Sequence, residues 1–282
     1  MRYGFVFPSG EARTAAEFAR AAELSGWDGF FVWEPVWGVD AWVSLAAAAM
    51  LTERIHLGTL LTPPSRIRPW KLASETATLD RLSNGRVILS IGLGALDSGF
   101  ESFGEVTDRK TRAELLDEGL EILTGLWRGM PFQFQGKHYQ IDVNKNNFHT
   151  PPPPPPVQSP RIPIWVVGAY GSKKSMRRAL RYDGLLPNII GEDGKVRMSP
   201  PTPEEIREIA AYIEANRIET APYDIIVEGM TPGNNPTAAD NIVSPYREAG
   251  ATWWIESRWQ PKDENEILDR IQHGPPDIQK IS

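Results

Sequence analysis

Short apolar runs alternate with longer stretches of helical periodicity along this chain, and that alternation constrains the fold more than any other feature of the sequence. The runs are rich in β-branched and aromatic residues, and a repeated order of strand and helix is typical of parallel βα units. Eight runs can be counted in the 282 residues, and closed α/β barrels commonly have about 250 residues in one domain. We therefore predict an α/β fold, a (β/α)8 TIM barrel forming one domain over residues 1–282. The predicted strands are residues 3–7, 29–33, 55–61, 86–91, 164–167, 184–186, 224–227 and 252–255.

Three pairs of residues have the spacing of a capping box, in which a side chain at the helix start and a Glu three residues later bond to each other's backbone N–H groups. Each pair precedes a stretch with an apolar stripe that can pack on a sheet. Pro203 also stands at the favoured first position of a helix. We expect helices to begin at all three places. The pairs are Thr14 with Glu17, Thr202 with Glu205, and Asp263 with Glu266.

The stretch between the fourth and fifth predicted strands is longer than the other connections. It contains a predicted helix at about residues 109–127 and a predicted hairpin, PFQFQGKHYQI. Six prolines, Pro151 to Pro156, follow it, and such a run favours a stiff polyproline II segment. We interpret about residues 95–160 as an insertion in the barrel, with the prolines as its rigid return.

The composition excludes several classes of site. The chain has no cysteine, so it holds no disulfide, thiolate zinc site, iron–sulfur cluster or thiol nucleophile. A net charge of −6 without blocks of Lys or Arg gives no basic surface for nucleic acid. No apolar run approaches the roughly 20 residues that span a bilayer, and MRYGFVFPSG reads as a strand rather than a leader. We expect a cytoplasmic protein that does not enter membranes.

A TIM barrel carries its active site in the loops after the carboxyl ends of its strands. Glu34 follows the second strand between Trp33 and Pro35, where poor solvation can raise its pKa into the range suited to proton transfer. Glu34 is therefore the first candidate for a catalytic acid or base. The alternative is a structural carboxylate, paired with an arginine or bonded to a loop backbone. The candidate arginine partners are Arg66, Arg68 and Arg258.

Three further candidates stand at the ends of later strands. Glu228 closes the seventh strand and Glu256 closes the eighth, and both are further acid or base candidates. Arg258 follows the eighth strand, where it can face an anionic substrate group or the electron-rich edge of a flavin. No histidine stands at a predicted carboxyl end, and no cluster of carboxylates and histidines there predicts a metal. The four histidines are His56, His138, His149 and His273.

A glycine-rich stretch follows the fifth strand and precedes a helix rich in Lys and Arg. Backbone N–H groups in such a turn can converge on a phosphate, to which a hydroxyl and nearby lysines can add. An ordinary βα turn is an equal alternative on spacing alone. The stretch is Gly168, Ala169, Tyr170, Gly171 and Ser172.

Three stretches together resemble the bacterial luciferase-like monooxygenase family. They are IHLGTLLTPPSRIRPWKLASETATLDRLSNGRVILSIGLG, RAELLDEGLEILTGLWRGMPFQFQGKHYQI and TPPPPPPVQSPRIPIWVVGA. The resemblance is close over about residues 2–187 and loose beyond. It implies a (β/α)8 barrel with an insertion, a homodimer, and binding of reduced FMN or the deazaflavin coenzyme F-420 for oxygen insertion or hydride transfer.

The resemblance also implies cofactor-binding residues. The family's phosphate loop lies at residues 168–172, which favours that reading over an ordinary turn. Thr59-Leu60 aligns with a non-prolyl cis peptide beneath the flavin ring, and Gly92-Leu93-Gly94 with a segment that lets the ring approach closely, because glycine has no Cβ. We expect Phe7 to pack against the ring. Further aromatic residues expected to line the mouth are Trp33, Trp37, Trp70, Trp254 and Trp259.

The sequence departs from the family at two positions. Many members end the second strand in Asp-His, where this chain has Trp33-Glu34-Pro35. Deazaflavin-dependent sugar-phosphate dehydrogenases carry a glutamate after the fourth strand, where this chain has Ala95. That dehydrogenase activity is therefore not expected.

Our first functional hypothesis is a monooxygenase that uses reduced FMN, O2 and a small organic substrate, with a separate flavin reductase supplying the FMN. The alternatives are deazaflavin-dependent hydride transfer and a noncatalytic flavin-binding member of the family. An aldolase or isomerase ranks last, because no Schiff-base lysine or metal cluster stands at a strand end.

Overall fold

Eight parallel strands close into a barrel in the computed structural model, which describes residues 1–129, 132–143, 153–197 and 199–276. Around the barrel the strand order is β1-β10-β9-β8-β7-β4-β3-β2. This confirms the predicted TIM-barrel fold. The barrel strands are β1 (Arg2–Phe7), β2 (Gly29–Val32), β3 (His56–Thr62), β4 (Val87–Ile91), β7 (Ile164–Tyr170), β8 (Gly184–Ile189), β9 (Asp224–Gly229) and β10 (Trp253–Ser257).

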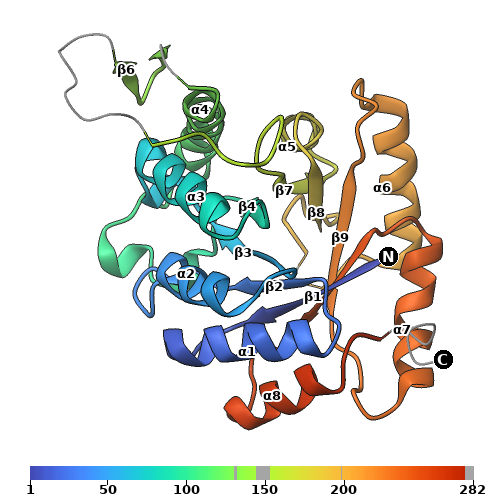
Figure 1. Cartoon of the computed structure of the whole chain (residues 1–282). Helices are drawn as coiled ribbons and strands as arrows, with labels where there is room; N and C mark the ends of the chain where they lie inside the picture. Colours follow the sequence, from blue (N-terminus) through green and yellow to red (C-terminus); the bar gives the residue numbers. More distant parts are fainter. Residues whose placement is uncertain (130–131, 144–152, 198, 277–282) are drawn as a thin grey trace.

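One α-helix follows each barrel strand, and the helices surround the strands (Figure 1). Within the described ranges, none of these helices has both the length and the apolar character to cross a bilayer. The helices are α1 (Ala12–Leu24), α2 (Ala41–Leu51), α3 (Pro69–Leu82), α4 (Arg109–Trp127), α5 (Lys173–Ala179), α6 (Pro203–Asn216), α7 (Pro236–Glu248) and α8 (Glu264–Gln272).

All eight predicted strands fall on barrel strands, but β7 and β8 are longer than predicted. Gly168 pairs with Pro187 and Tyr170 pairs with Ile189, so residues 168–170 belong to the sheet rather than to a turn. A Cβ on Gly168 would lie 2.4 Å from Leu185 Cδ1. The glycine therefore serves close packing inside the sheet, a role that its sequence context does not distinguish from a turn.

Two of the three predicted helix starts are confirmed. Thr202 and Glu205 form the reciprocal capping box at α6, and Asp263 accepts a bond from Glu266 N–H at α8. The start predicted at Thr14 is wrong, because α1 already begins at Ala12 and has no side-chain cap. Ala and Arg favour helix formation, and Ala12 and Arg13 extend α1 by about half a turn before Thr14.

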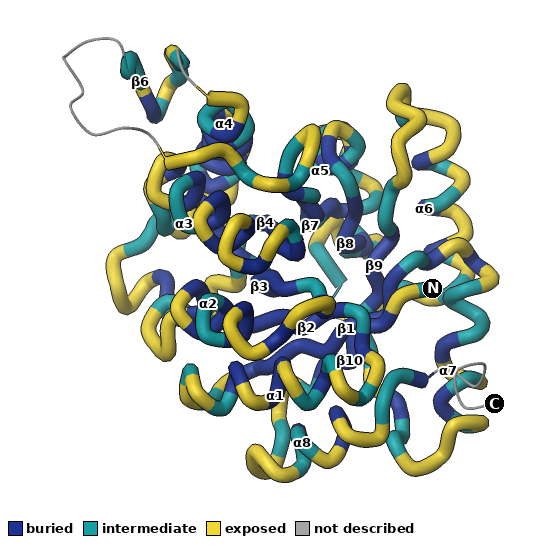
Figure 2. Tube along the Cα trace, in the orientation of Figure 1, coloured by how far each residue is buried: buried dark blue, intermediate teal, exposed yellow. Residues whose placement is uncertain are grey.

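Aromatic rings fill the half of the barrel interior that lies nearer the amino ends of the strands. Phe31 lies 5.3 Å from Trp165, and Trp165 lies 5.0 Å from Trp253, measured between ring centroids. A second, larger apolar layer lies between the strands and the helices. In Figure 2 the strands are buried, and the exposed residues lie on the outer faces of the helices. Within the described part of the chain, these rings leave for a ligand the half of the interior nearer the carboxyl ends of the strands.

The segment between β4 and β7 contains short 3-10 turns at Leu96–Ser98 and Glu101–Phe103, helix α4 and an antiparallel hairpin. A further 3-10 turn, Pro64–Arg66, precedes α3. The hairpin strands, β5 (Gln133–Gln135) and β6 (Gln140–Asp142), stand beside α4, outside the barrel (Figure 1). Helix α4 begins and ends where the sequence predicted, at residues 109 and 127. The limits of an insertion, at about residues 95–160, stay a prediction, as does one domain over residues 1–282.

The chain returns from this segment by way of a buried carboxylate. Asp80 of α3 accepts bonds from Val157 N (2.8 Å), Gln158 N (3.1 Å) and Gln158 Nε2 (2.7 Å). These bonds fix the residues that follow the proline run. Of that run, Pro151 and Pro152 lie outside the described residues.

Arg86 joins three elements at the opposite end of the barrel from the mouth. It is 7% exposed, and its guanidinium donates to the carbonyls of Ala49, Thr52, Ile55 and Ser83 and to the Thr52 hydroxyl, over 2.7–3.1 Å. These groups end α2, precede β3 and end α3. One side chain therefore satisfies carbonyls that helix geometry leaves without partners.

We predict that Arg86→Met lowers the free energy of unfolding by about 3 kcal/mol, because several buried carbonyls lose their donor at once. Urea unfolding followed by circular dichroism measures the change. The matched control is Arg54→Met, at an exposed arginine, with an expected change of about 0.5 kcal/mol or less. A loss below about 1 kcal/mol for Arg86→Met would show that water replaces these bonds.

Candidate active site

A cavity of about 500 Å³ opens at the carboxyl ends of β3, β7, β8, β9 and β10. We call it the mouth cavity. Its size lies in the range of small-molecule sites, which are mostly apolar with a few polar groups. The apolar walls are Leu61, Val167, Leu186, Ile226, Met230 and Trp259, and the polar lining residues include Asn188, Arg197, Glu228 and Ser257.

The glycine segment after β4 lies against one wall of the mouth cavity. A Cβ on Gly92 would come 3.0 Å from Val167 Cγ2 and 3.2 Å from Leu61 Cδ2, both on lining residues. Arg112 holds the segment from behind, because its Nη1 donates to the carbonyls of Leu93 (2.8 Å) and Gly94 (3.0 Å). The structure thus brings Gly92 to the cavity wall, and contact of Gly92-Leu93-Gly94 with a cofactor stays a prediction.

Glu228 brings a carboxyl group into the mouth cavity. Burial raises its pKa to about 7, and a hydrogen bond from the Trp259 side chain lowers it in part. Ile226, two residues earlier on β9, points into the barrel interior, so the alternation of a strand places Glu228 on the same side. A carboxyl with a pKa near neutrality can both give and take a proton.

Glu34 lies in a separate, smaller cavity of about 320 Å³, together with Trp37, Asp40, Arg66 and Glu105. Burial raises the pKa of Glu34 to about 7, against a hydrogen bond from Thr62 and the charge of Arg66. The structure does not bring Glu34 and Glu228 into one cavity.

The partners of Glu34 come from the loop after β3. Its Oε2 accepts a bond from the Thr62 hydroxyl, which lies 2.7 Å from the Thr59 hydroxyl. Arg66 Nη2 donates to the Glu34 carbonyl at 3.0 Å and lies 3.8 Å from Oε1. Of the arginine partners considered, Arg66 is the one in contact. The sequence placed Thr62 at the start of a loop after a strand end but assigned it no role, and the structure shows it as the partner of Glu34.

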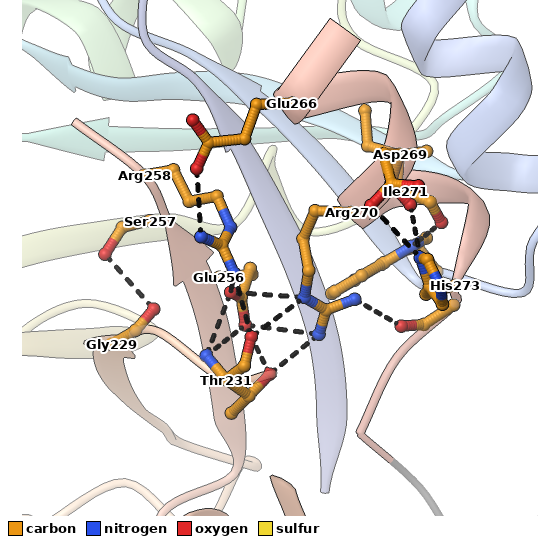
Figure 3. Close-up of polar contacts among 12 residues, drawn as sticks. Gly229, Thr231, Glu256, Ser257, Arg258, Glu266, Asp269, Arg270, Ile271 and His273 are labelled. Atoms are coloured by element: carbon orange, nitrogen blue, oxygen red, sulfur yellow. Dashed lines mark hydrogen bonds and ion pairs between the residues drawn. The ribbon is translucent and has the colours of Figure 1, made fainter. Parts of the chain in front are cut away.

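Arg258 does not reach the mouth cavity. Figure 3 shows it among polar groups outside the barrel, where Nη2 donates to the Thr231 carbonyl at 2.9 Å and lies 3.6 Å from Glu256 Oε1. Glu266 Oε1 lies 3.4 Å from its Nη1. Because Ser257 lines the cavity, the next side chain points outward. The structure therefore supports a structural role for Arg258 rather than contact with substrate.

Phe7 also points away from the mouth. It is 2% exposed, and its ring lies 5.6 Å from Phe18 of α1 and 6.1 Å from Phe30. Val6, its neighbour, takes the interior position. Trp254 likewise packs outward, 5.6 Å from Tyr246. These rings hold helices on the sheet, and Trp259 is the expected aromatic residue that lines the mouth cavity.

The cis peptide bond in β3 joins Leu60 and Leu61, one residue after the predicted Thr59-Leu60. That position is a correction to the alignment with the family. Thr59 is fully buried, and Leu60 lies in the interior cluster. Leu61 lines the mouth cavity, and no feature of the sequence distinguishes it from its neighbours.

The predicted phosphate stretch is divided between strand and turn. Ala169 N donates to Ser175 Oγ at 2.9 Å and Ser172 N to the Ala169 carbonyl at 3.0 Å, so these two N–H groups have partners within the protein. Tyr170 packs against Tyr212 of α6, 5.9 Å away. Gly171 has a φ of +99°, which favours glycine. Phosphate binding by residues 168–172 stays a prediction.

The three histidines that the structure describes are placed away from the mouth. His56 begins β3, His138 Nε2 lies 2.9 Å from Glu114, and His273 Nδ1 lies 2.7 Å from the Asp269 carbonyl. His149 lies outside the described residues. In the part of the chain that the structure describes, no group of carboxylates and histidines has the arrangement of a metal site.

Comparison with known proteins identifies the family. The sequence profile described as luciferase-like monooxygenase matches residues 2–252. The chain belongs to the luciferase-like monooxygenase family. A relative from Mycobacterium tuberculosis, an uncharacterised protein, is 33% identical over 226 residues, which cover 70% of this chain and 77% of the relative.

A second relative carries a functional name. The F420-dependent glucose-6-phosphate dehydrogenase of Amycolatopsis mediterranei is 34% identical over 139 residues. The matched region covers 46% of this chain and 42% of that enzyme. The chain thus matches less than half the length of this relative.

Solved structures share the fold at low identity. The coenzyme F420-dependent tetrahydromethanopterin reductase of Methanopyrus kandleri has a TM-score of 0.74 and 17% identity, covering 97% of this chain and 98% of that one. The oxygenating constituent of 3,6-diketocamphane monooxygenase of Pseudomonas putida, in complex with FMN, has a TM-score of 0.65 and 20% identity. The matched region covers 86% of this chain and 71% of that monooxygenase chain.

We predict that Glu34 makes folding less favourable as the pH rises. Its pKa is about 7 in the folded protein and 4.5 as a model value, so the folded state binds more protons between these pH values. Wild-type stability relative to Glu34→Gln should therefore fall by up to about 3 kcal/mol from pH 4.5 to pH 7 and stay constant above. Urea unfolding of both proteins at several pH values measures the difference.

The control for this series is Glu17→Gln, at an exposed glutamate of α1. Its stability should follow that of the wild type at every pH. Parallel curves for wild type and Glu34→Gln would show that the Glu34 carboxyl titrates normally in the folded protein.

Proposed function

We propose that this chain is an oxidoreductase that binds a flavin or deazaflavin ring in the mouth cavity and acts there on a small organic substrate. The observation that carries the proposal is a carboxyl group with a pKa of about 7 in an otherwise mostly apolar cavity at the carboxyl ends of the barrel strands. Membership of the luciferase-like family supports the same class of reaction.

The lining residues fit a planar aromatic ring. The apolar side chains Leu61, Val167 and Trp259 give it flat contact area and exclude water. Gly92, without a Cβ, lets the lining residues Val167 and Leu61 pack closely against the end of β4. The ring, when bound, supplies the two-electron chemistry. Glu228 gives or takes the proton that the substrate exchanges.

The cofactor has two candidates within this proposal. Reduced FMN with O2 and a partner flavin reductase is the reaction that the family resemblance predicts. The deazaflavin F-420 is favoured by the relative from Amycolatopsis, whose name includes that cofactor. Ala95 replaces the glutamate of the sugar-phosphate dehydrogenases, so we do not extend the substrate of that relative to this chain.

A homodimer remains part of the proposal. Helix α2 has no charged residue, and its outward side exposes Val43 (61%), Met50 (68%) and Leu51 (44%). An apolar helix face of this kind is a suitable surface for a second copy of the chain. A cytoplasmic location stays a prediction.

We predict that the protein binds FMN or F-420 in at least one redox state with a Kd of about 10 µM or tighter, which corresponds to roughly 7 kcal/mol. Fluorescence and absorbance titrations with both cofactors, oxidised and reduced, measure this. Turnover that requires O2 would identify the FMN monooxygenase, and turnover that proceeds without O2 would identify the deazaflavin enzyme. Failure to bind either ring would contradict the proposed function.

We predict that Glu228→Gln lowers kcat by about 100-fold or more, since it removes the proton-transfer group, and leaves the Kd of the cofactor within about twofold. The limb of the wild-type pH profile near pH 7, expected from the pKa of about 7, should disappear. The control is Glu192→Gln, at an exposed glutamate, with unchanged kcat. An unchanged pH profile in Glu228→Gln would assign proton transfer to another group.

A further inference from the structure

A buried cluster of charged and polar side chains lies beside the mouth cavity, on the outer side of β9 and β10 (Figure 3). Glu256 of β10 is fully buried, and Arg270 of α8 is 3% exposed. Arg270 Nε lies 3.3 Å from Glu256 Oε1, and its Nη2 donates to Oε2 at 3.3 Å. Both side chains also bond to Thr231, which follows β9. We call these three residues the Glu256 cluster.

Every polar atom of Thr231 is bonded within this cluster. Its N–H donates to both Glu256 oxygens, at 3.0 and 3.1 Å, and its hydroxyl donates to Oε2 at 2.7 Å. The hydroxyl also accepts a bond from Arg270 Nη2 at 2.7 Å, and the carbonyl accepts one from Arg270 Nε at 3.2 Å. The pairing of β9 with β10 ends with Gly229 opposite Glu256. The carboxylate therefore joins the two segments beyond the point at which backbone pairing stops.

Further contacts hold the segment 258–262, which follows β10 and contains Trp259. Arg258 Nη2 donates to the Thr231 carbonyl at 2.9 Å. Glu266 of α8 contacts both ends of the segment. Its Oε1 lies 3.4 Å from Arg258 Nη1, and its Oε2 accepts a bond from Lys262 N at 2.9 Å. Trp259 thus stands in a short segment that is bonded on either side.

Residues of the Glu256 cluster alternate along the chain with residues that line the mouth cavity. Met230 lines the cavity directly before Thr231, and Ser257 lines it directly after Glu256. Trp259 lines it two residues further along. Side chains of adjacent residues in an extended chain point to opposite sides, so the same stretch of backbone carries a cluster residue outward and a lining residue inward. A displacement of the cluster would therefore displace the lining residues.

The contact of Trp259 with Glu228 depends on this placement. Both residues line the mouth cavity. Burial raises the pKa of the Glu228 carboxyl, and a bond from the Trp259 side chain lowers it in part. Trp259 is 43% exposed, so its own packing restrains it little. Arg197 is the other charged lining residue in the described ranges, and Glu205 offsets its charge through two bonds of 2.8 and 2.6 Å.

We propose that Glu256, Thr231 and Arg270 are positioning residues of the mouth cavity, which hold Trp259 in hydrogen-bond contact with Glu228. Both oxygens of Glu256 accept bonds from within the protein. Glu256 therefore acts as a structural carboxylate rather than as the acid or base that its place at a strand end predicts. This inference rests on the proposed function, in which Glu228 exchanges a proton with the substrate.

The experiment follows the Trp259 indole N–H in the protein without cofactor. NMR spectra of protein carrying isotope-labelled tryptophan contain one indole signal for each of the 10 tryptophans. The signal that Trp259→Phe removes belongs to Trp259. Ionisation of Glu228 strengthens the acceptor of this N–H, so the signal should shift as the pH is raised through neutrality. Glu228→Gln should abolish the shift, which assigns it to that carboxyl.

Two variants weaken the Glu256 cluster. Glu256→Gln/Arg270→Met removes both charges together, so that no buried charge is left without its partner. Thr231→Val removes only the hydroxyl that bridges the two charges and keeps the shape of the side chain. The control is Arg86→Met, which removes a buried arginine at the opposite end of the barrel. It lowers stability without changing a residue beside the mouth cavity.

The wild-type Trp259 signal should titrate with a midpoint near the pKa of about 7 of Glu228. Its shift should fall to less than about half in the double variant and by a smaller amount in Thr231→Val, because a hydrogen bond weakens steeply as its angle departs from linearity. Arg86→Met should retain the wild-type shift. Urea unfolding of all variants shows that the stability loss of the control is comparable.

A wild-type Trp259 signal that does not respond to Glu228 would overturn the proposal, and so would a full response in both cluster variants. If the double variant does not fold, Thr231→Val alone decides. An equal loss in Arg86→Met would assign the effect to general destabilisation and would also overturn it. None of these measurements requires a cofactor. If no ring binds the protein, the proposed function fails, while the role of the Glu256 cluster is still decided by the indole signal.

Discussion

Closure of the barrel around three aromatic rings is the constraint on which the site depends. The rings of Phe31, Trp165 and Trp253 fill the half of the interior nearer the amino ends of the strands. Nearer the carboxyl ends of the strands, the interior positions carry smaller or polar residues, among them Glu228 and Ser257. Because side chains alternate along a strand, the strand positions that place these rings inside also determine which residues face the open half near the carboxyl ends. The mouth cavity is therefore a consequence of how the core is filled.

The order of the elements could be predicted from the sequence because strand and helix periodicities are local. Whether a given side chain points into the barrel or outward could not be predicted from the sequence, because this depends on knowing one interior residue in each strand. Once Val6 and Ser257 are known to point inward, alternation turns Phe7 and Arg258 outward. The end of β7 was missed for another reason, since Gly168 reads as a turn but accommodates Leu185 of the neighbouring strand.

The two half-buried glutamates have similar raised pKa values but lie in different surroundings. The sequence predicted a raised pKa for Glu34 from its apolar neighbours, and burial does raise it. Its contacts, however, are Thr62 and Arg66, which join the loops after β2 and β3. Glu228 has a similar pKa but shares its cavity with the apolar walls that suit a ring. Location, more than pKa, is why Glu228 rather than Glu34 is the proposed proton-transfer group.

The charge of helix α5 is difficult to explain by folding alone. Lys173 and Arg177 stand four residues apart on this seven-residue helix, and like charges at that spacing repel and destabilise a helix. The chain as a whole carries a net charge of −6, so carboxylates that could offset these cations are abundant elsewhere. The exposed cations Lys173, Lys174 and Arg177 therefore lower the stability of α5 without a carboxylate partner among the described residues.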